Sequence, residues 1–283
     1  MTAPPQPAAD AGTAGAAEPV IGLRGATLAY GDRVLWRDLD LDVRPGEFWA
    51  VLGPNGSGKT SLLRVLLGLH PLTAGTLRLT GAPGGRASRT AIGYVPQQRA
   101  IDAHAPLRAR DFVRLGIDGH RWGPPLFGGR AVRDRVDAAL ADVAATGYAD
   151  VPVGLLSGGE QQRVRVAQAL VTDPRVLLCD EPLLSLDPHH QRAVSALIDR
   201  VRRRRGTAVV FVTHEINPVL DLVDQVLYLA GGRFRAGTVA DVMTTRVLSD
   251  LYGSPVEVVR AAGRLIVAGA PDTVDGCHPE ATP

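Results

Sequence analysis

The sequence predicts an α/β fold built on a parallel β-sheet. Three short apolar runs carry this prediction: FWAVL at 48–52, VLLCD at 176–180 and AVVFVTH at 208–214. A continuous apolar run is typical of a strand that is buried on both faces of such a sheet. Apolar residues at helical spacing follow the first run and separate the other two, and they are Leu62, Val65, Leu66 and Leu69, then Val194, Leu197, Ile198 and Val201. This alternation of strands and helices predicts βαβ units.

The chain begins with a low-complexity segment and continues with short strands. Residues 1–18 are mostly Ala, Pro and Gly, with almost nothing large to bury, and they predict a disordered tail. The stretch LAYGDRVL predicts a hairpin around Gly31 and Asp32. Apolar residues then alternate with charged ones, and they are Leu39, Leu41 and Val43. Strict alternation predicts an antiparallel region with one face exposed to water.

Two further regions complete the layout. The stretch from about Ala100 to Leu155 predicts a helical insertion with an irregular loop at GPPLFGG, and its apolar residues at helical spacing are Val132, Val136, Leu140 and Val143. Near the end, VLYLAGGRFRAG predicts a hairpin over Gly231 and Gly232, and PVEVV with RLIVAG predicts a last strand pair. The parts that we expect are the tail 1–18, a main domain over 19–253 with a helical subdomain at about 100–165, and a strand pair with a frayed tail over 254–283.

Composition argues against several classes of protein. The chain is 45% hydrophobic and 21% charged, as an ordinary globular domain is. Its net charge of +2 is too balanced to indicate a nucleic-acid partner. We find neither an apolar run of the ~18 residues that a membrane-spanning helix needs nor a signal peptide, so we expect a cytoplasmic protein. The two cysteines, Cys179 and Cys277, favour neither a disulfide framework nor a thiolate metal site.

A glycine-rich segment follows the first apolar strand. Its sequence, GPNGSGKT, matches the P-loop pattern G-x-x-x-x-G-K-T between a buried strand and an apolar helix. We expect its N–H groups to bind the phosphates of ATP, Lys59 to reach the β- and γ-phosphates and Thr60 to ligate Mg²⁺. Lys59 is also the single lysine among 31 basic residues. The residues expected to bind nucleotide here are Gly53, Pro54, Asn55, Gly56, Ser57, Gly58, Lys59, Thr60 and Ser61.

Acidic residues and a histidine end the other two apolar strands. Asp180 is expected to join the magnesium shell through bound water, and Glu181 is the candidate general base that polarises the attacking water. His214 is the candidate contact of the γ-phosphate, so Glu181 and His214 are the expected catalytic residues. Two acids at a strand end can also be solvated caps, but their place after a P-loop favours the catalytic role.

A second helix start that can bind an anion lies in LSGGEQQR. Ser157, Gly158, Gly159 and Glu160 present a hydroxyl and backbone N–H groups there. Because the P-loop already surrounds the phosphates from its own side, we expect this segment to act in trans, on ATP bound to a second copy of the chain in a homodimer. The three residues SGG alone would fit a plain helix start, whereas the whole string after a P-loop favours the role in trans.

Together these motifs resemble the nucleotide-binding subunits of ABC transporters. The resemblance covers nearly all of 20–253 and rests on Tyr30, GPNGSGKT, GYVPQQ, LSGGEQQR, VLLCDEP, SLD and VTH in the order of the family. It implies a P-loop NTPase core with an antiparallel β-subdomain and an inserted helical subdomain. It also implies that Tyr30 stacks on adenine, that Gln97 links Mg²⁺ to the helical insertion and that Asp187 helps to couple the two sites of the dimer. The choice of Gln97 over Gln98 comes from the resemblance alone.

The finer sequence texture is similar to ATPase subunits of manganese, zinc or iron importers. The stretches that carry this similarity are YVPQQ, PLRARDFVRLGIDGHRW, EPLLSLDP, THEINPVLDLVDQVLYLAGGRFRAG and VLSDLYGSPVEVV. The resemblance implies integral membrane permease subunits as partners, an extracellular substrate-binding protein as an indirect partner, and a place on the inner face of the cell membrane. Cargo would be selected by those partners, so no residue of this chain is expected to touch it. Cys277 and His278 are interpreted as part of the frayed tail.

Other functions compete with this hypothesis. One is an importer ATPase for another cargo, and another is a soluble ATPase of the same superfamily that acts on nucleic acid or ribosomes. Such soluble members usually carry long coiled coils or two cassettes, and this sequence has neither. The basic run RVRRRRG at 200–206 lies at a predicted helix end, where positive charge favours the helix dipole, so we interpret it as a solvated helix end and expect no nucleic-acid partner. A small-molecule kinase would not explain Ser157 to Glu160.

Overall fold

The computed structural model describes residues 18–79, 91–97, 106–119 and 129–269. Several predictions concern residues outside these ranges, namely almost all of the tail, Gln98, most of the GPPLFGG loop, and Cys277 with His278. Of the helices in the described ranges, none combines the length and the apolar character needed to cross a membrane.

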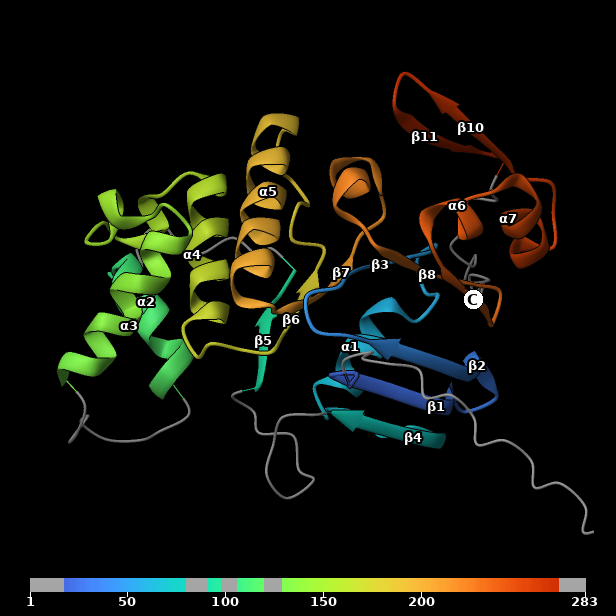
Figure 1. Ribbon diagram of the computed structural model, residues 1–283, viewed down its shortest axis with the longest axis horizontal. Helices are drawn as coiled ribbons and strands as arrows, with labels where there is room; N and C mark the ends of the chain where they lie inside the picture. The colour runs from blue at the N-terminus through green and yellow to red at the C-terminus, as the bar shows by residue number, and fades with distance from the viewer. Residues whose placement is uncertain (1–17, 80–90, 98–105, 120–128, 270–283) are drawn as a thin grey trace, which may run out of the picture.

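A six-stranded sheet forms the centre of the fold, with the strand order β5-β6-β7-β3-β8-β9 (Figure 1). Its strands are β3 (Phe48–Leu52), β5 (Ile92–Val95), β6 (Val176–Asp180), β7 (Ala208–Val212), β8 (Gln225–Ala230) and β9 (Arg233–Gly237). The first five strands are parallel, and β9 is antiparallel to β8. The three predicted apolar runs are β3, β6 and β7, and they are buried at every position. The predicted α/β fold with a parallel sheet is confirmed.

A second, antiparallel sheet has the strand order β2-β1-β4. Its strands are β1 (Ile21–Tyr30), β2 (Arg33–Val43) and β4 (Ala74–Leu79). Tyr30 pairs with Arg33 across the predicted hairpin. Leu39, Leu41 and Val43 are buried, while Asp40 and Asp42 between them are not, so the predicted alternation between a dry face and a wet face is confirmed.

Helix α1 (Lys59–Leu66) follows β3 and joins the two sheets in one core. Leu62, Val65 and Leu66 are buried, as their spacing predicts. The prediction for Leu69 was wrong, since this side chain is 72% exposed. The physical reason is that the helix ends at Leu66, too early to carry Leu69 round to the buried face.

The other helices pack beyond the parallel sheet and form the helical part of the molecule (Figure 1). They are α2 (Ala109–Asp118), α3 (Gly129–Asp142), α4 (Gly158–Leu170) and α5 (Pro188–Arg205), with 3-10 turns at Thr146–Tyr148 and Val153–Leu155. Helix α4 contacts α2, α3, α5 and β5. The predicted apolar positions of α5 are all buried, and so are Val136 and Leu140 of α3. Val143 is buried as well, but it lies just after the end of α3.

The C-terminal part contains two hairpins, one at the end of the six-stranded sheet and one that forms a separate two-stranded sheet. Strands β8 and β9 form the predicted hairpin over Gly231 and Gly232, and β10 (Glu257–Ala261) and β11 (Arg264–Ala268) form the predicted last pair. Helices α6 (Val239–Val242) and α7 (Thr245–Tyr252) lie between the hairpins in the chain. The side chain of Asn217, in the 3-10 helix Asn217–Leu222, donates to the carbonyl of Leu265 and accepts from its N–H, both at 2.9 Å. This amide therefore ties the last hairpin to the core.

The basic run at the end of α5 is more than the solvated helix end that we expected. Arg202 is buried, and its guanidinium donates to Asp199 at 2.9 Å and to Asp224 at 2.5 Å. Arg204 lies 2.9 Å from Asp142 at the end of α3, and Arg205 pairs with the same carboxylate. The run is thus a set of ion pairs that joins α5 to the residue before β8 and to the end of α3.

Candidate active site

The P-loop connects β3 to α1 and is shaped by its glycines. Gly53 has a φ of +140°, and a Cβ atom there would lie 2.0 Å from the carbonyl oxygen of Leu229, so only glycine fits. Gly58 precedes α1 in the left-handed region, with a φ of +99°, and no side chain of the described residues caps the helix. The first N–H groups of α1 are therefore left for a ligand, as an anion-binding helix start requires.

Lys59 is held inside this loop. Its side-chain ammonium donates to the carbonyl oxygens of Gly53 at 2.7 Å and Pro54 at 2.9 Å, and the residue is only 5% exposed. Burial lowers the pKa of Lys59, while the nearby charges of Glu181 and Asp180 act in the opposite direction. The loop carbonyls thus place one compact positive charge at the start of α1.

Asp180 ends β6 as a buried carboxyl group. Burial, and next the charge of Glu181, raise the pKa of Asp180, whereas hydrogen bonds from Tyr94 and Thr60 lower it. The hydroxyl of Tyr94 donates to Asp180 at 3.4 Å, and burial with the Asp180 charge raises the pKa of Tyr94 to about 12. The hydrogen bond from Thr60 joins the predicted magnesium residue of α1 to the predicted magnesium residue of β6. Together they offer the hydroxyl and carboxylate oxygens that Mg²⁺ prefers.

Glu181 is fixed by partners from two other strand ends. The side-chain amide of Gln97, after β5, donates to one carboxylate oxygen at 3.1 Å, and the Nε2 atom of His214, after β7, pairs with the other. The backbone of Glu181 is in the left-handed region, with a φ of +48°, and its N–H donates to Val212 at 3.0 Å. The structure therefore brings Glu181, His214 and Gln97 together, because the carboxyl ends of parallel strands meet at one edge of the sheet.

A single cleft joins this edge to the predicted adenine residue. It is lined by Tyr30, Arg33, Leu35, Asn55, Gly56, Gly58, Lys59, Thr60, Ser61 and Glu181. The ring of Tyr30 is partly exposed and contacts the ring of His70 edge-on, with centroids 4.8 Å apart. The cleft is open and polar at the P-loop end and aromatic at the Tyr30 end, which suits a nucleotide.

Sequence reasoning missed two residues of this site. Arg33 lines the cleft and donates to the carbonyl of Gly56 at 3.0 Å, and Tyr94 holds Asp180. Neither residue was named as a site residue in the sequence analysis. Tyr94 lies within GYVPQQ, three residues before Gln97, so its position on β5 beside β6 could have indicated it.

The LSGGE segment starts α4, on the far side of β6 and α5 from α1 (Figure 1). Ser157 is the N-cap and forms a capping box with Glu160. The N–H and hydroxyl of Ser157 donate to the Glu160 carboxylate at 2.9 and 2.7 Å, and the N–H of Glu160 donates to the Ser157 hydroxyl at 3.4 Å. The hydrogen bonds from Ser157 are the main reason why the pKa of Glu160 is lowered. The described residues that line the P-loop cleft include none of the LSGGE residues.

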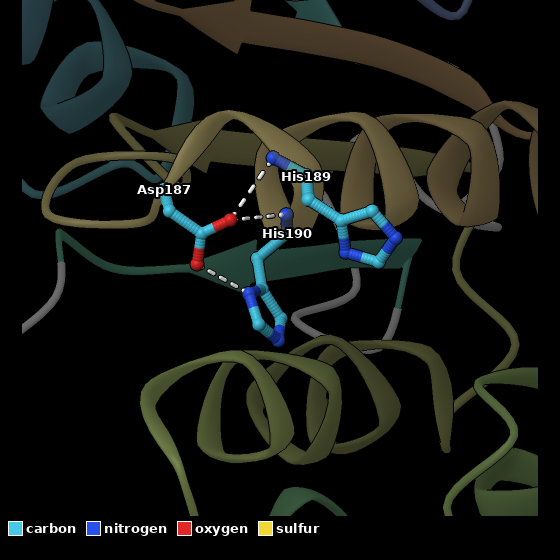
Figure 2. A group of neighbouring side chains, drawn as sticks. All are labelled: Asp187, His189 and His190. Atoms are coloured by element: carbon cyan, nitrogen blue, oxygen red, sulfur yellow. Dashed lines mark hydrogen bonds and ion pairs between the residues drawn. The ribbon is translucent and has the colours of Figure 1, made fainter.

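Asp187 begins α5 as its N-cap (Figure 2). One carboxylate oxygen accepts from the N–H groups of His189 and His190 at 3.0 and 3.1 Å, and the other lies 2.5 Å from Nδ1 of His190. The ring of His190 packs against the LSGGE helix, because a Cβ atom at Gly159 would lie 2.4 Å from its Cδ2 atom. The turn that contains Asp187 and the LSGGE glycine Gly159 are thus neighbours in one chain.

Fold and cleft define the class: an ATP-binding P-loop cassette with a helical part. The family model described as ABC transporter matches residues 36–184. The zinc import ATP-binding protein ZnuC of Halorhodospira halophila is 38% identical over 245 residues, 86% of this chain and 87% of the relative. The zinc transport system ATP-binding protein TroB of Treponema pallidum is 34% identical over 231 residues, 81% of this chain and 85% of the relative.

Solved structures agree with this assignment. An inward-facing putative metal-chelate type ABC transporter matches with a TM-score of 0.74 and 25% identity, over 88% of this chain and 96% of the other. The dimeric bacterial ABC transporter cassette MJ0796 matches with a TM-score of 0.64 and 28% identity, over 77% of this chain and 98% of the other. This chain belongs to the ABC transporter family, and it is an ATPase that binds ATP.

Proposed function

We propose that this chain is the ATPase subunit of a binding-protein-dependent importer of a divalent metal, with zinc as the first candidate. The observation that carries the ATPase chemistry is the cleft that places Tyr30, Lys59, Thr60 and Glu181 around one space. The metal assignment is supported by relatives named for zinc import and zinc transport, at 38% and 34% identity. The main domain is taken as residues 19–253, with the helical subdomain at about 100–165, followed by the short strand pair and tail of 254–283.

In this proposal the P-loop side of the cleft binds the nucleotide. Tyr30 stacks on adenine, the loop from Gly53 to Ser61 surrounds the phosphates, and Lys59 turns from its loop carbonyls towards the β- and γ-phosphates. Thr60 and Gln97 would hold Mg²⁺, with Asp180 acting through bound water. When bound, Mg²⁺ neutralises charge on the phosphate oxygens.

The β6 end of the cleft performs hydrolysis. Glu181 accepts a proton from the attacking water, and Gln97 and His214 keep its carboxylate oriented. His214 also contacts the γ-phosphate. The positive φ of Glu181 supports this role, because strained backbone tends to be retained where a site needs a fixed orientation.

Transport requires partners that this chain would engage through its other elements. Ser157, Gly158, Gly159 and Glu160 serve ATP held by a second copy, so two chains close head to tail around the nucleotide. Asp187 couples the two sites. Closure moves permease subunits that dock on the helical part, at the inner face of the cell membrane, and an extracellular substrate-binding protein delivers the metal. The metal is the cargo of the permease, and no residue of this chain lies on its path.

The cargo is tested by the metal content of cells. Cells limited for zinc, manganese or iron would express either the native protein or the Glu181→Gln variant, and elemental mass spectrometry would measure all three metals. We expect a selective fall in zinc with the variant. A selective fall in manganese or iron would replace zinc as the cargo, and no change in any metal would contradict metal import while leaving the ATPase assignment in place.

A further inference from the structure

The first turn of α5 carries three side chains that can ligate a metal (Figure 2). Asp187, His189 and His190 each place one potential ligand atom within 4.8 Å of the other two. Of the three, Asp187 alone has a part in the proposed hydrolysis machinery. The two histidines are unexplained by ATP binding, and Figure 2 shows both at the start of α5, with His190 pointing towards α4.

We propose that Asp187, His189 and His190 form a binding site for Zn²⁺ at the start of α5. Two imidazole nitrogens and one carboxylate oxygen are a common zinc donor set, and a fourth position would remain for water. Imidazole suits zinc better than it suits magnesium or manganese, which prefer oxygen ligands. The site is separate from the magnesium residues of the cleft, Thr60 and Asp180.

The hydrogen bonds of Asp187 leave one of its oxygens available. One oxygen accepts the two backbone N–H groups that cap α5, and the other lies against Nδ1 of His190. That second oxygen lies 2.5 Å from Nδ1 of His190. When the ring carries its proton on Nε2, Nδ1 and the carboxylate both present lone pairs to a cation.

The three ligand atoms lie within 4.8 Å of one another and would have to rearrange to accept the ion. Two ligand atoms on a tetrahedral zinc lie about 3.3 Å apart, given metal–ligand distances of about 2.0 Å. The side chains of His190 and Asp187 are 44% and 57% exposed, so they are free to separate by that amount. The rings of His189 and His190 are 5.6 Å apart and nearly perpendicular, at 87°, so they do not stack on each other and exclude the ion. The positive end of the α5 dipole opposes a cation, and the carboxylate of Asp187 offsets it.

The position of the site suggests a regulatory consequence. His190 packs against Gly159 of the LSGGE helix. A zinc ion would therefore hold Asp187 to the start of α5, beside the LSGGE helix, and keep it from its partner chain. Bound zinc would then slow ATP turnover, so that imported metal limits further import. This consequence rests on the proposed function, whereas the binding of zinc does not.

Zinc binding would be measured on the full chain without nucleotide, by competition with a coloured zinc chelator. The variants are His189→Ala and His190→Asn, because asparagine keeps a donor for Asp187 but lacks the ring nitrogens. The control is the double variant Cys277→Ala with His278→Ala, which removes the adjacent cysteine and histidine near the end of the sequence. We expect about one zinc per chain in the native and control proteins, and binding weaker by at least 10-fold in each histidine variant, since even the loss of an outer partner weakens metal binding about 10- to 100-fold.

Three results would overturn the site: unchanged zinc affinity in both histidine variants, loss of zinc binding in the Cys277 and His278 control, or tighter binding of Mn²⁺ than of Zn²⁺. Melting curves of the variants would show that each is folded. The regulatory consequence is measured separately, as the ratio of ATP turnover with and without zinc in excess Mg²⁺. We expect this ratio to fall for the native and control proteins and to stay near one for His189→Ala. A ratio near one in every protein would overturn the regulation and leave the zinc site standing.

Discussion

The molecule contains two helix starts suited to anions, and they are built in opposite ways. Helix α1 begins after Gly58 with no side-chain cap from the described residues and with Lys59 buried at its first position. Helix α4 begins at Ser157, where a capping box with Glu160 takes the hydroxyl and two N–H groups. The first start is open to a phosphate in the isolated chain, whereas at the second the polar groups of Ser157 and Glu160 already bind each other.

The two helix starts also carry side chains of opposite charge. Lys59 supplies a positive charge to the first turn of α1, while α4 has Glu160 as the acidic residue of its first turn. A lone phosphate would gain little at α4, because it must compete with a carboxylate that is already bound there. In the proposed function, therefore, α4 acts on a nucleotide that the P-loop and α1 of a second chain already hold.

The largest effect should come from Glu181→Gln, which stops ATP hydrolysis. In the proposed dimer, hydrolysis is the step that releases α4 of one chain from the nucleotide held by α1 of the other. Glutamine has the same size and can still accept from Gln97, but it cannot take a proton from water. We expect ATP turnover to fall about 10²- to 10⁴-fold while ATP binding is kept. Size-exclusion chromatography with ATP should then show an accumulated dimer.

The matched control is Glu257→Gln on strand β10, which makes the same chemical change far from the cleft along the chain. Its turnover should equal that of the native protein. Normal turnover in Glu181→Gln would remove this residue as the general base.

The second largest effect should come from Lys59→Ala, which removes the positive charge from the start of α1. Hydrogen bonds to charged groups contribute about 1.5–3 kcal/mol, so ATP should bind about 10- to 100-fold more weakly. Fluorescent nucleotide titration of the isolated chain measures this. Lys59→Arg is the control, and it should bind with intermediate affinity because it keeps the charge but not the compact shape. Equal affinity of all three proteins would contradict the assigned role of Lys59.

A smaller effect is expected from Ser157→Ala, which removes the cap of α4. Loss of an N-cap costs about 1 kcal/mol, or about 2–4 °C in Tm for a chain of this size. We expect lower turnover as well, with nearly unchanged ATP affinity of the isolated chain. Thr238→Ala is the matched control, since Thr238 and Asp241 form the same capping box on α6. That variant should lose stability but keep turnover, and a loss of monomer ATP binding in Ser157→Ala would contradict a role in trans.

The smallest effect concerns the pH dependence of α4. The folded pKa of Glu160 is below its ordinary value of 4.5, so its contribution to stability is present above that value and is lost as the pH falls through the folded pKa. Glu160→Gln keeps an acceptor for Ser157 but has no such titration. We therefore expect the native protein to have the higher Tm at pH 7 and the difference to shrink below about pH 4.5. In a Ser157→Ala background, the difference in Tm between the proteins with and without Glu160→Gln should be smaller at pH 7. A Tm difference that stayed constant with pH in the native background would refute the link to Ser157.

Local sequence patterns predicted the parallel sheet and most of the cleft. Strands β3, β6 and β7 are continuous apolar runs, and the residues that end them must meet at one sheet edge. Glu181 and His214, which follow β6 and β7, are therefore neighbours despite their separation in sequence, whereas Gln97 follows β5 and was expected from the family resemblance. The P-loop was also predictable, because its residues are consecutive in the sequence and lie between a predicted strand and a predicted helix.

The residues that sequence reasoning missed depend on contacts between distant segments. Arg33 reaches Gly56 only because the hairpin folds over the P-loop. Arg204 reaches Asp142 from another helix, so a basic run that looked solvated became a set of ion pairs. His190, at the start of α5, packs on Gly159 at the start of α4. None of these pairings leaves a periodic signal in the sequence.

The central claim is that the start of α4 in one chain serves the ATP held by α1 of another. The most direct test mixes two differently labelled variants, Lys59→Ala and Gly158→Asp, each also carrying Glu181→Gln. Aspartate in the first turn favours the helix dipole, so α4 should stay folded while its charge repels the γ-phosphate.

In the mixed pair, the intact P-loop of the Gly158→Asp chain faces the intact LSGGE segment of the Lys59→Ala chain. The measurement is the amount of doubly labelled dimer in size-exclusion chromatography with ATP. With the two variants in equal amounts, random pairing gives as many mixed dimers as the two kinds of homodimer taken together, and we predict that ATP produces mixed dimers in excess of that proportion. If ATP produced no more mixed dimers than homodimers, the two helix starts would not share a nucleotide and the claim would be wrong.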